Sequence, residues 1–374
     1  MNVIFTCGGT GGHINPAISV ANILKEKEPD CNILFIGAAG GMEETLVPKA
    51  GYELKGLPAS GLTRSFTPKA IWNNIVGVAR IASALEQSRK IIRDFKPDVI
   101  LGTGGYASFP ALYMGSRMGI PTCVHEANAV PGLATRLVAN RVDQILVCFE
   151  ESRSRYSRQD KVEAVGMPIR REFVYTDRRK AREELGLDER PLIVSAFGSL
   201  GAREMNKAIA RFMKLEQDEG MPYQHIHATG SYGWRWMPEH VREVGVRIED
   251  CSGLDMKEYI YNMPTLMAAA DLVISRAGAS SCNEIAASGT PCILIPSPNV
   301  TDNHQEKNAR VLADRGACVM IRESDCSGQR LYDEAKRLLS DPRRCSDMRK
   351  ALLEWVVPNS AEQICDKIIK LSRR

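Results

Sequence analysis

A chain of 374 residues is too long for one ordinary hydrophobic core and fits two domains. Its 44% hydrophobic and 25% charged residues are typical of a folded globular protein. A net charge of +4 is too small for a dedicated nucleic-acid binder, so we do not expect nucleic acid as a partner.

The eleven cysteines include no C-x-x-C pair. This argues against a zinc site and favours small buried side chains in a reducing cytoplasm. The start of the chain, Met1–Phe5, predicts a strand rather than a signal peptide. No apolar stretch is long enough to span a bilayer, so we expect any membrane contact to be peripheral.

The first half of the chain alternates short apolar runs with longer amphipathic stretches. This pattern predicts a parallel sheet covered by helices on both faces. The predicted strands are residues 2–6, 32–36, 98–102, 121–124, 144–148 and 162–165.

The first predicted strand leads into a glycine loop, Cys7–His13. Glycine allows a sharp turn close to a ligand, and the helix start behind the loop suits a phosphate group. The loop lacks the third glycine of a dinucleotide fingerprint, and no acidic residue closes the second predicted strand, which argues against a dehydrogenase. His13 is compatible with a capping or solvated histidine and equally with a general base.

A basic amphipathic stretch covers residues 62–93, where Thr67 and Pro68 predict a helix start. Ile71 and Ile75 belong to its apolar stripe, and Trp72 widens that stripe. Two interpretations stay open: a core helix with a solvated basic face, or an interfacial helix on anionic lipid.

Two more polar segments follow predicted strands of the first half. The loop Gly102–Tyr106 repeats the glycine pattern, and His125–Asn128 follows the strand 121–124. Ligands of open α/β sheets bind beyond the carboxyl ends of the strands. A simple turn is the alternative for His125–Asn128; we favour a functional role for Asn128 and leave Glu126 open.

The second half repeats the strand–helix rhythm after a polar, basic segment. We place an interdomain linker over residues 166–190. A third glycine loop, Phe197–Arg203, follows the first strand of this half. The predicted strands are residues 191–197, 223–228, 245–249, 271–275, 291–295 and 317–321.

Two segments of the second half carry candidate ligand contacts. Ser281 and Glu284 have the spacing of a capping box, but Glu284 also suits ribose hydroxyls beside a diphosphate loop. In the polar stretch 296–308, Gln305 is placed to bond sugar hydroxyls, with a solvated face as the alternative.

Together, five motifs resemble those of the peptidoglycan N-acetylglucosaminyltransferases that convert lipid I to lipid II. The motifs, in order, are Gly8–Pro16, Gly104–Tyr106, His125–Asn128, Gly198–Arg203 and Arg276–Glu284. The match runs nearly end to end. Departures from the family pattern are Ala127, Leu200 and His304, where the family usually has glutamine.

The resemblance implies an α/β protein of the GT-B type, with two Rossmann-like parallel-sheet domains facing across a cleft. It implies an acceptor- and membrane-facing domain over 1–165 and a UDP-GlcNAc-binding domain over 191–357, with a tail helix over 358–374 packing back on the first domain. The implied reaction moves GlcNAc, with inversion, from UDP-GlcNAc to the 4-hydroxyl of MurNAc in undecaprenyl-diphospho-MurNAc-pentapeptide.

Site residues are implied in the same way. His13 would be the general base or transition-state stabiliser, and Glu126 a second catalytic residue. Gly104, Gly105 and Tyr106 would form an acceptor-diphosphate loop. The donor UDP-GlcNAc would contact Thr10, Gly11, Gly12, Asn128, Arg170, Ser199, Ile260, Ala279, Ser280, Ser281, Cys282, Asn283, Glu284 and Gln305. The membrane patch would be Phe66, Ile71, Trp72, Ile75 and Arg80.

We expect no cofactor and no metal, since the sequence has no D-x-D triplet. We expect the protein on the cytoplasmic face of the cell membrane, bound peripherally to the anionic inner leaflet. Cell-wall and division proteins are left open as partners. The alternatives are a diacylglycerol glycosyltransferase, a hydrolysing UDP-GlcNAc epimerase, and a non-catalytic nucleotide-sugar-binding subunit that recruits a partner to the membrane.

Overall fold

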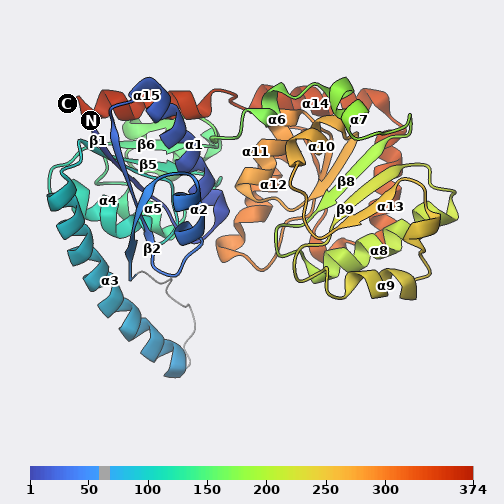
Figure 1. The fold of residues 1–374 in the computed structure, drawn as a ribbon, viewed down its shortest axis with the longest axis horizontal. Coiled ribbons are helices and arrows are strands. Elements are labelled where there is room, and N and C mark those ends of the chain that lie inside the picture. The colour runs from blue at the N-terminus through green and yellow to red at the C-terminus, as the bar shows by residue number, and fades with distance from the viewer. Residues whose placement is uncertain (59–67, 374) are drawn as a thin grey trace. The chain divides into compact units, whose positions relative to one another are not determined.

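The computed structural model describes the backbone of residues 1–58 and 68–373 and the side chains of residues 1–58 and 80–373. The chain forms two compact units (Figure 1). Unit 1 contains Met1–Ile169 and Val357–Arg374, and unit 2 contains Arg170–Val356.

Unit 1 is built on a seven-stranded sheet of order β3-β2-β1-β4-β5-β6-β7, with every pair parallel. The strands are β1 (Asn2–Thr6), β2 (Asn32–Ala38), β3 (Glu53–Leu57), β4 (Val99–Gly102), β5 (Thr122–Glu126), β6 (Gln144–Val147) and β7 (Val162–Ala164). The helices are α1 (Gly11–Lys27), α2 (Glu43–Lys49), α3 (Pro68–Phe95), α4 (Ser108–Arg117), α5 (Leu133–Val138) and α15 (Ser360–Ser372).

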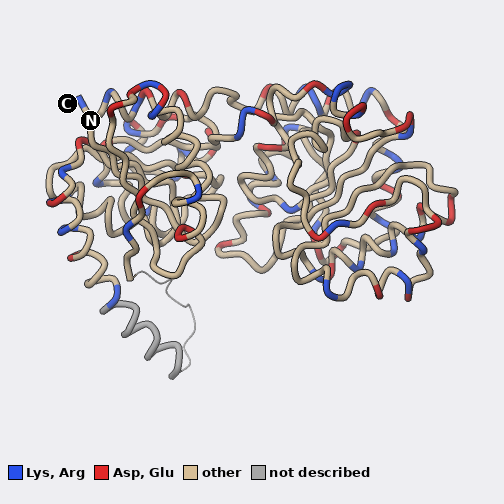
Figure 2. Tube along the Cα trace, in the orientation of Figure 1, with Lys and Arg blue, Asp and Glu red and all other residues tan. Residues whose placement is uncertain are grey.

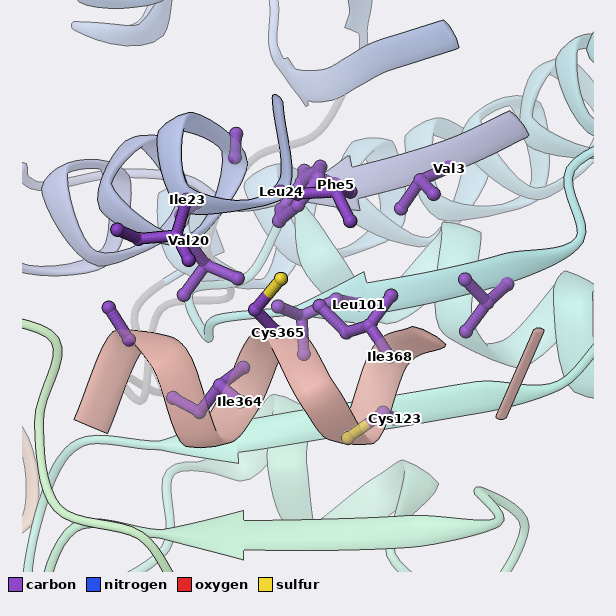
Figure 3. Packing of buried hydrophobic residues seen from close by; sticks show 14 of the residues in the cluster. Val3, Phe5, Val20, Ile23, Leu24, Leu101, Cys123, Ile364, Cys365 and Ile368 are labelled. Atoms are coloured by element: carbon purple, nitrogen blue, oxygen red, sulfur yellow. The ribbon is translucent and has the colours of Figure 1, made fainter. Parts of the chain in front are cut away.

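Alternating strand residues of unit 1 fill two cores, one on each face of the sheet. Val3 and Phe5 of β1 pack with α1 and α15, whereas Ile4 packs with α3, α4 and α5. Figure 3 shows Ile364 and Ile368 of α15 within the first of these cores. The last helix of the chain is therefore an integral layer of unit 1.

Unit 2 is built on a six-stranded parallel sheet of order β10-β9-β8-β11-β12-β13. The strands are β8 (Leu192–Ala196), β9 (Gln224–Ala228), β10 (Leu254–Lys257), β11 (Leu272–Ser275), β12 (Cys292–Leu294) and β13 (Val319–Met320). The helices are α6 (Glu172–Tyr175), α7 (Arg178–Glu184), α8 (Arg203–Asp218), α9 (Met237–Glu243), α10 (Met263–Ala269), α11 (Ala279–Ser288), α12 (His304–Asp314), α13 (Gly328–Leu339) and α14 (Pro342–Trp355). Short 3-10 turns lie at Glu150–Arg155 and Gln159–Lys161 in unit 1, and at Ile248–Asp250, Thr301–Asn303 and Glu323–Asp325 in unit 2.

The expected α/β class with two parallel sheets is confirmed, and three local expectations differ from the structure. Strand β3 was not predicted because it is a polar edge strand, with Glu53 exposed. The strand expected at 245–249 is wrong: β10 lies further along the chain, and the apolar Val246 is instead a buried anchor in the turn after α9.

The segment expected as a linker, 166–190, contains the helices α6 and α7, and it belongs to unit 2 from Arg170 onward. Asp177 caps α7 by accepting the Lys180 N–H at 2.9 Å. Arg178 and Arg182 form ion pairs with Asp271 at 2.6 and 3.2 Å. The basic composition of this stretch therefore serves helix docking.

Charged side chains of both signs are interspersed over the outer helices and loops of each unit (Figure 2). Nine of the eleven cysteines are buried, and none forms a disulfide. No helix within the described part of the chain is both long and apolar enough to cross a membrane.

Candidate functional site

Sheet topology brings two predicted glycine loops of unit 1 together. Strands β1 and β4 are neighbours, with Thr6 opposite Gly102, and the chain leaves them in different directions through α1 and α4. This is the switch point at which doubly wound sheets bind ligands. Gly105 has φ +81°, and a Cβ there would lie 2.0 Å from the Gly8 carbonyl oxygen. The two loops are therefore in contact and need glycine at this position.

His13, the third residue of α1, lies at this junction. Its Nδ1 is 3.1 Å from the Gly8 carbonyl oxygen and 3.2 Å from Thr10 Oγ1. Because a carbonyl only accepts, the Gly8 contact requires a hydrogen on Nδ1, so the neutral ring carries its lone pair on Nε2. A Cβ on Gly104 would lie 3.2 Å from that Nε2, so the second loop leaves room for the ring. This arrangement suits a base that takes a proton through Nε2.

The start of α1 offers backbone donors beside His13. The first bonds of the helix are donated by the His13 and Ile14 N–H groups to Thr10 O. The N–H groups of Gly11 and Gly12 precede these bonds and point out of the helix end. Such amides suit an anionic group. The expected contacts of Thr10, Gly11 and Gly12 with UDP-GlcNAc stay a prediction.

One buried acid at this junction was not predicted from the sequence. Glu43, the first residue of α2, is fully buried, and its Oε1 accepts the N–H groups of Gly9 at 3.0 Å and Ala38 at 3.3 Å. Together with burial, its charge raises the pKa values of Cys7 and Tyr106. Tyr106 itself is exposed, with its ring against Gly9.

The segment after β5 is organised by Glu126, which is 4% exposed. Its Oε1 accepts the backbone and side-chain N–H groups of Asn128 at 3.0 and 3.2 Å. Its Oε2 accepts the Gly132 N–H at 3.0 Å and the Thr135 hydroxyl at 2.7 Å. Four donors hold both carboxylate oxygens, so this geometry favours positioning of Asn128 over proton transfer by Glu126.

His125 lies inside the sheet rather than at the ligand edge. It is fully buried, its Nε2 donates to the Gly166 carbonyl oxygen at 2.8 Å, and burial lowers its pKa. A positive charge on His13 acts to lower the pKa of His125 further. His125 is therefore a neutral neighbour that supports the chain where it leaves β7.

Unit 2 has the same topology at its own switch point. Strands β8 and β11 are neighbours, with Ala196 opposite Ser275, so the loops that follow them lie side by side. The third glycine loop and the start of α12 line a pocket of about 320 Å³. Its lining residues are Phe197, Gly201, Ala202, Arg203, Glu204, Arg276, Ser297, Asn299, Gln305 and Glu323. A larger hollow of about 730 Å³ adjoins it and shares Glu204 and Glu323.

Arg276 and Gln305 are fixed within the smaller pocket. The Arg276 guanidinium pairs with Glu323 at 2.5 Å and donates to the Ile295 carbonyl oxygen at 3.1 Å. Gln305 Oε1 accepts the Ser297 N–H at 2.9 Å. The pairing of Arg276 with Glu323 was not predicted from the sequence, because Glu323 lies in a separate turn before α13.

The capping-box alternative for Ser281 and Glu284 is wrong. Helix α11 begins at Ala279 with Gly278 as its N-cap, so Ser281 lies within the first turn and cannot be the capping residue. The Cys282 N–H donates to Gly278 O, which leaves the N–H groups of residues 279–281 at the helix end.

Two residues that were expected to contact UDP-GlcNAc are buried in α11. Cys282 is 0% exposed, and Asn283 is 1% exposed with its side chain donating to Ala279 O at 2.9 Å. Neither side chain reaches the surface. The groups that this helix end leaves accessible are therefore the backbone of residues 279–281 and the half-buried side chains of Ser280 and Ser281.

Glu284 and Arg170 form an electrostatic pair in unit 2. Burial raises the pKa of the Glu284 carboxyl to about 7, and the Arg170 charge acts to lower it. Arg170 is exposed, and its guanidinium lies 5.0 Å from the Phe173 ring centre. The Glu284 carboxyl is therefore partly protonated near neutral pH, and acids with such shifted pKa values are common at functional sites.

Two further expected donor contacts lie elsewhere in unit 2. Ser199 is exposed in the third glycine loop, and its carbonyl oxygen accepts the Ser231 N–H at 3.1 Å. The Ile260 side chain is 4% exposed, so only its backbone is suited to contact a base. Tyr259 and Tyr261 flank it with rings 4.9 Å apart and are 47% and 86% exposed.

The expected membrane patch lies largely outside the described residues. Phe66 is outside them, as are the side chains of Ile71, Trp72 and Ile75. Arg80 is exposed on α3, and further along Ala84 and Ile92 are buried against the sheet of unit 1. As for a metal, the described residues contain no group of three or more His, Cys, Asp and Glu side chains placed to hold one.

Comparison with known proteins supplies the family. The glycosyltransferase family 28 N-terminal domain matches residues 3–147, and the family 28 C-terminal domain matches residues 192–364. A relative from Acetivibrio thermocellus is 40% identical over 98% of this chain and 97% of its own length. That protein is named UDP-N-acetylglucosamine--N-acetylmuramyl-(pentapeptide) pyrophosphoryl-undecaprenol N-acetylglucosamine transferase.

Two solved structures share the fold. Acinetobacter baumannii MurG matches with a TM-score of 0.77 and 23% identity, covering 99% of both chains. Neisseria meningitidis UDP-GlcNAc 2-epimerase, bound to UDP-GlcNAc, matches with a TM-score of 0.68 and 13% identity over 99% of this chain and 100% of the other. The family models and the full-length relative confirm the resemblance found in the sequence: the chain belongs to glycosyltransferase family 28, among its peptidoglycan N-acetylglucosaminyltransferases.

Proposed function

We propose that this protein transfers GlcNAc from UDP-GlcNAc to the 4-hydroxyl of the MurNAc unit of undecaprenyl-diphospho-MurNAc-pentapeptide, with inversion at the anomeric carbon. The observation that carries the proposal is the likeness to the Acetivibrio thermocellus transferase along 97% of that relative's length. The two switch-point sites supply groups that fit the chemistry of each substrate.

The proposed mechanism assigns the proton to His13. Its Nε2 takes the hydrogen of the acceptor 4-hydroxyl while that oxygen attacks C1 of GlcNAc. The bond from C1 to the diphosphate breaks, and UDP leaves with the electron pair. Holding the Nδ1 hydrogen on the Gly8 carbonyl keeps the imidazole in the tautomer this step requires.

Donor binding is assigned to unit 2. The amides at the start of α11 and the glycine loop with Ser199 are suited to the diphosphate, with Arg170 nearby to oppose the charge that develops on UDP. Glu284 is assigned to the ribose hydroxyls, the Ile260 backbone to uracil, and Gln305 to GlcNAc hydroxyls. Preorganised donors of this kind stabilise a leaving diphosphate where its charge appears.

Acceptor binding is assigned to unit 1. The Gly104–Tyr106 loop is assigned to the acceptor diphosphate, whereas Thr10 and the amides of Gly11 and Gly12 are assigned to UDP-GlcNAc. Asn128, which is positioned by its hydrogen bonds to Glu126, is assigned a contact with UDP-GlcNAc. We also propose peripheral attachment to an anionic membrane surface through α3, because its described part exposes Arg80, Arg89, Lys90 and Arg93.

The test offers UDP-GlcNAc with a soluble lipid I analogue, with diacylglycerol, or with water alone. Product containing GlcNAc only in the lipid I arm supports the proposal. Transfer to diacylglycerol supports the lipid alternative. Release of UDP together with the free 2-epimer of GlcNAc supports the hydrolysing epimerase alternative. Absence of transfer in every arm, with UDP-GlcNAc bound, indicates a non-catalytic binding protein.

Membrane attachment is tested separately by sedimentation with vesicles of phosphatidylglycerol and phosphatidylcholine. Binding that rises with the phosphatidylglycerol fraction and falls with salt supports it. Equal binding to neutral and anionic vesicles argues against an electrostatic surface.

A further inference from the structure

We propose that Glu43 is a positioning residue for His13 and acts on it through the single peptide group that joins Gly8 to Gly9. The inference rests on the proposed role of His13 as the base. It adds an acid that no motif of the sequence indicated.

The pocket that holds Glu43 is made by glycines. A Cβ on Gly8 would lie 2.7 Å from Glu43 Oε1, one on Gly37 2.9 Å from its Cγ, and one on Gly41 2.2 Å from its Oε2. All three distances are shorter than side chains tolerate. Glycines from three places in the sequence therefore leave the space that one fully buried carboxyl fills.

One peptide group connects this carboxyl to His13. Its N–H, which belongs to Gly9, donates to Glu43 Oε1 at 3.0 Å. Its carbonyl oxygen, which belongs to Gly8, accepts the Nδ1 hydrogen of His13 at 3.1 Å. The order of groups is carboxylate, peptide, imidazole, and each bond points the same way.

This chain of bonds has a direct effect on the imidazole. A carboxylate that accepts the amide hydrogen draws negative charge toward the carbonyl oxygen of the same peptide, because hydrogen bonds in series polarise one another. The stronger acceptor holds the Nδ1 hydrogen more firmly and makes Nε2 more basic. In serine hydrolases a carboxylate contacts the histidine directly to the same end; here the peptide stands between them.

The burial of Glu43 favours this role over a purely mechanical one. Its Oε2 is buried and has no hydrogen-bond partner among the described residues. A neutral amide would join the loops equally well without burying a charge. The neighbouring titratable groups are His125, whose charge interacts with that of His13, and Tyr106 and Cys7, whose charges interact with that of Glu43.

The test compares Glu43→Gln, which removes the charge and keeps the shape, with Glu44→Gln. Glu44 is exposed and accepts a glycine N–H of its own, from Gly40 at 2.9 Å, but has no link to His13. The readout is the pH titration of the His13 imidazole by nitrogen NMR of histidine-labelled full-length protein. We expect Glu43→Gln to lower the pKa of His13 and Glu44→Gln to leave it unchanged.

Kinetics supply a second readout with the lipid I analogue. We expect Glu43→Gln to move the acid limb of kcat to lower pH and to lower its plateau roughly threefold to tenfold, with KM for UDP-GlcNAc unchanged. In a His13→Ala background the same substitution should have no further effect on kcat. An equal loss in both backgrounds, or an unchanged His13 titration in a folded Glu43→Gln protein, overturns the proposal.

A measurement on the unaltered protein covers the case in which Glu43→Gln does not fold. Neutral His13 must carry its hydrogen on Nδ1, and its nitrogen shifts report this directly. A hydrogen on Nε2 overturns the proposal. If the NMR results hold but no GlcNAc is transferred, the proposed function fails while the coupling of Glu43 to His13 stands.

Discussion

The side-chain oxygen of Gln305 accepts the backbone N–H of Ser297 at 2.9 Å. That bond fixes the orientation of the side-chain amide. Because Oε1 faces the Ser297 loop, the Nε2 hydrogens point away from that loop. Gln305 also lines the smaller pocket of unit 2. Sugar hydroxyl oxygens accept hydrogen bonds from N–H groups of this kind, and the first prediction follows from this orientation of Gln305.

Gln305→Ala should raise KM for UDP-GlcNAc about tenfold while leaving the affinity for UDP unchanged, because the lost bonds reach the sugar and not the nucleotide. Steady-state kinetics and calorimetry with UDP measure the two effects. Gln329→Ala is the control, since Gln329 is exposed on α13. If Gln305→Ala weakens the binding of UDP and of UDP-GlcNAc equally, Gln305 has only a structural role.

His13→Ala should lower kcat by roughly 10²- to 10⁴-fold with little change in UDP-GlcNAc affinity, because the lost group acts on the acceptor proton. The matched substitution is His240→Ala at a half-buried position in α9, far along the chain from the proposed site, and it should leave kcat intact. Rate and donor affinity falling by the same factor would contradict the assignment of His13.

Glu284→Gln should change how stability depends on pH. The folded-state pKa is raised to about 7 by burial, above the ordinary value of 4.5, so the folded protein holds this proton more tightly. The free energy of unfolding therefore falls as pH rises from about 4.5 to about 7, by no more than about 3 kcal/mol. Glu284→Gln removes that fall, as urea unfolding at several pH values will show.

Arg170→Ala is the companion to that experiment. Its charge acts to lower the pKa of Glu284, so its loss should extend the fall in stability to higher pH. If the stability of Glu284→Gln depends on pH in the same way as that of the unaltered protein, Glu284 is not the group responsible.

Glu284→Ala should also weaken the binding of UDP, because the proposed contact of the carboxyl with the ribose is lost. Calorimetry with UDP measures this effect.

Gly105→Ala should destabilise unit 1 by several kcal/mol, because the new methyl group meets the Gly8 carbonyl at 2.0 Å in addition to the strain of φ +81°. Gly119→Ala is a close control: φ is +75° there, but nothing lies within 4 Å of the added Cβ. We expect a cost of roughly 1 kcal/mol for Gly119→Ala, measured by urea unfolding. Similar losses for both variants would mean that the two loops are not in tight contact.

Much of the fold could be predicted because its signals are local. Apolar runs such as Val3–Phe5, followed by glycine loops, identify the central strands of both sheets, and these strands are buried on both faces. Edge strands carry weaker signals. Strand β3 contains exposed Glu53 and was missed, and the apolar Val246 suggested a strand where the chain makes a turn.

The site was predictable where one motif holds it and not where distant segments meet. His13 and Gln305 were singled out from the motifs around them, and their roles stay predictions. Glu43 is 34 residues from the Gly9 amide whose hydrogen bond it accepts, and its pocket is complete only when Gly8 lies beside Gly37 and Gly41. Ser281 and Glu284 show the opposite case: their spacing fits a capping box, but the helix starts three residues too early for it.

The product formed from UDP-GlcNAc and a lipid I analogue decides whether this chain catalyses the proposed transfer. We predict an acceptor heavier by one N-acetylhexosamine residue, joined through a β bond to the 4-hydroxyl of MurNAc by mass and proton NMR, and absent with His13→Ala. An α-linked product, or consumption of UDP-GlcNAc with the lipid I analogue unchanged, would rule out the proposed inverting transfer.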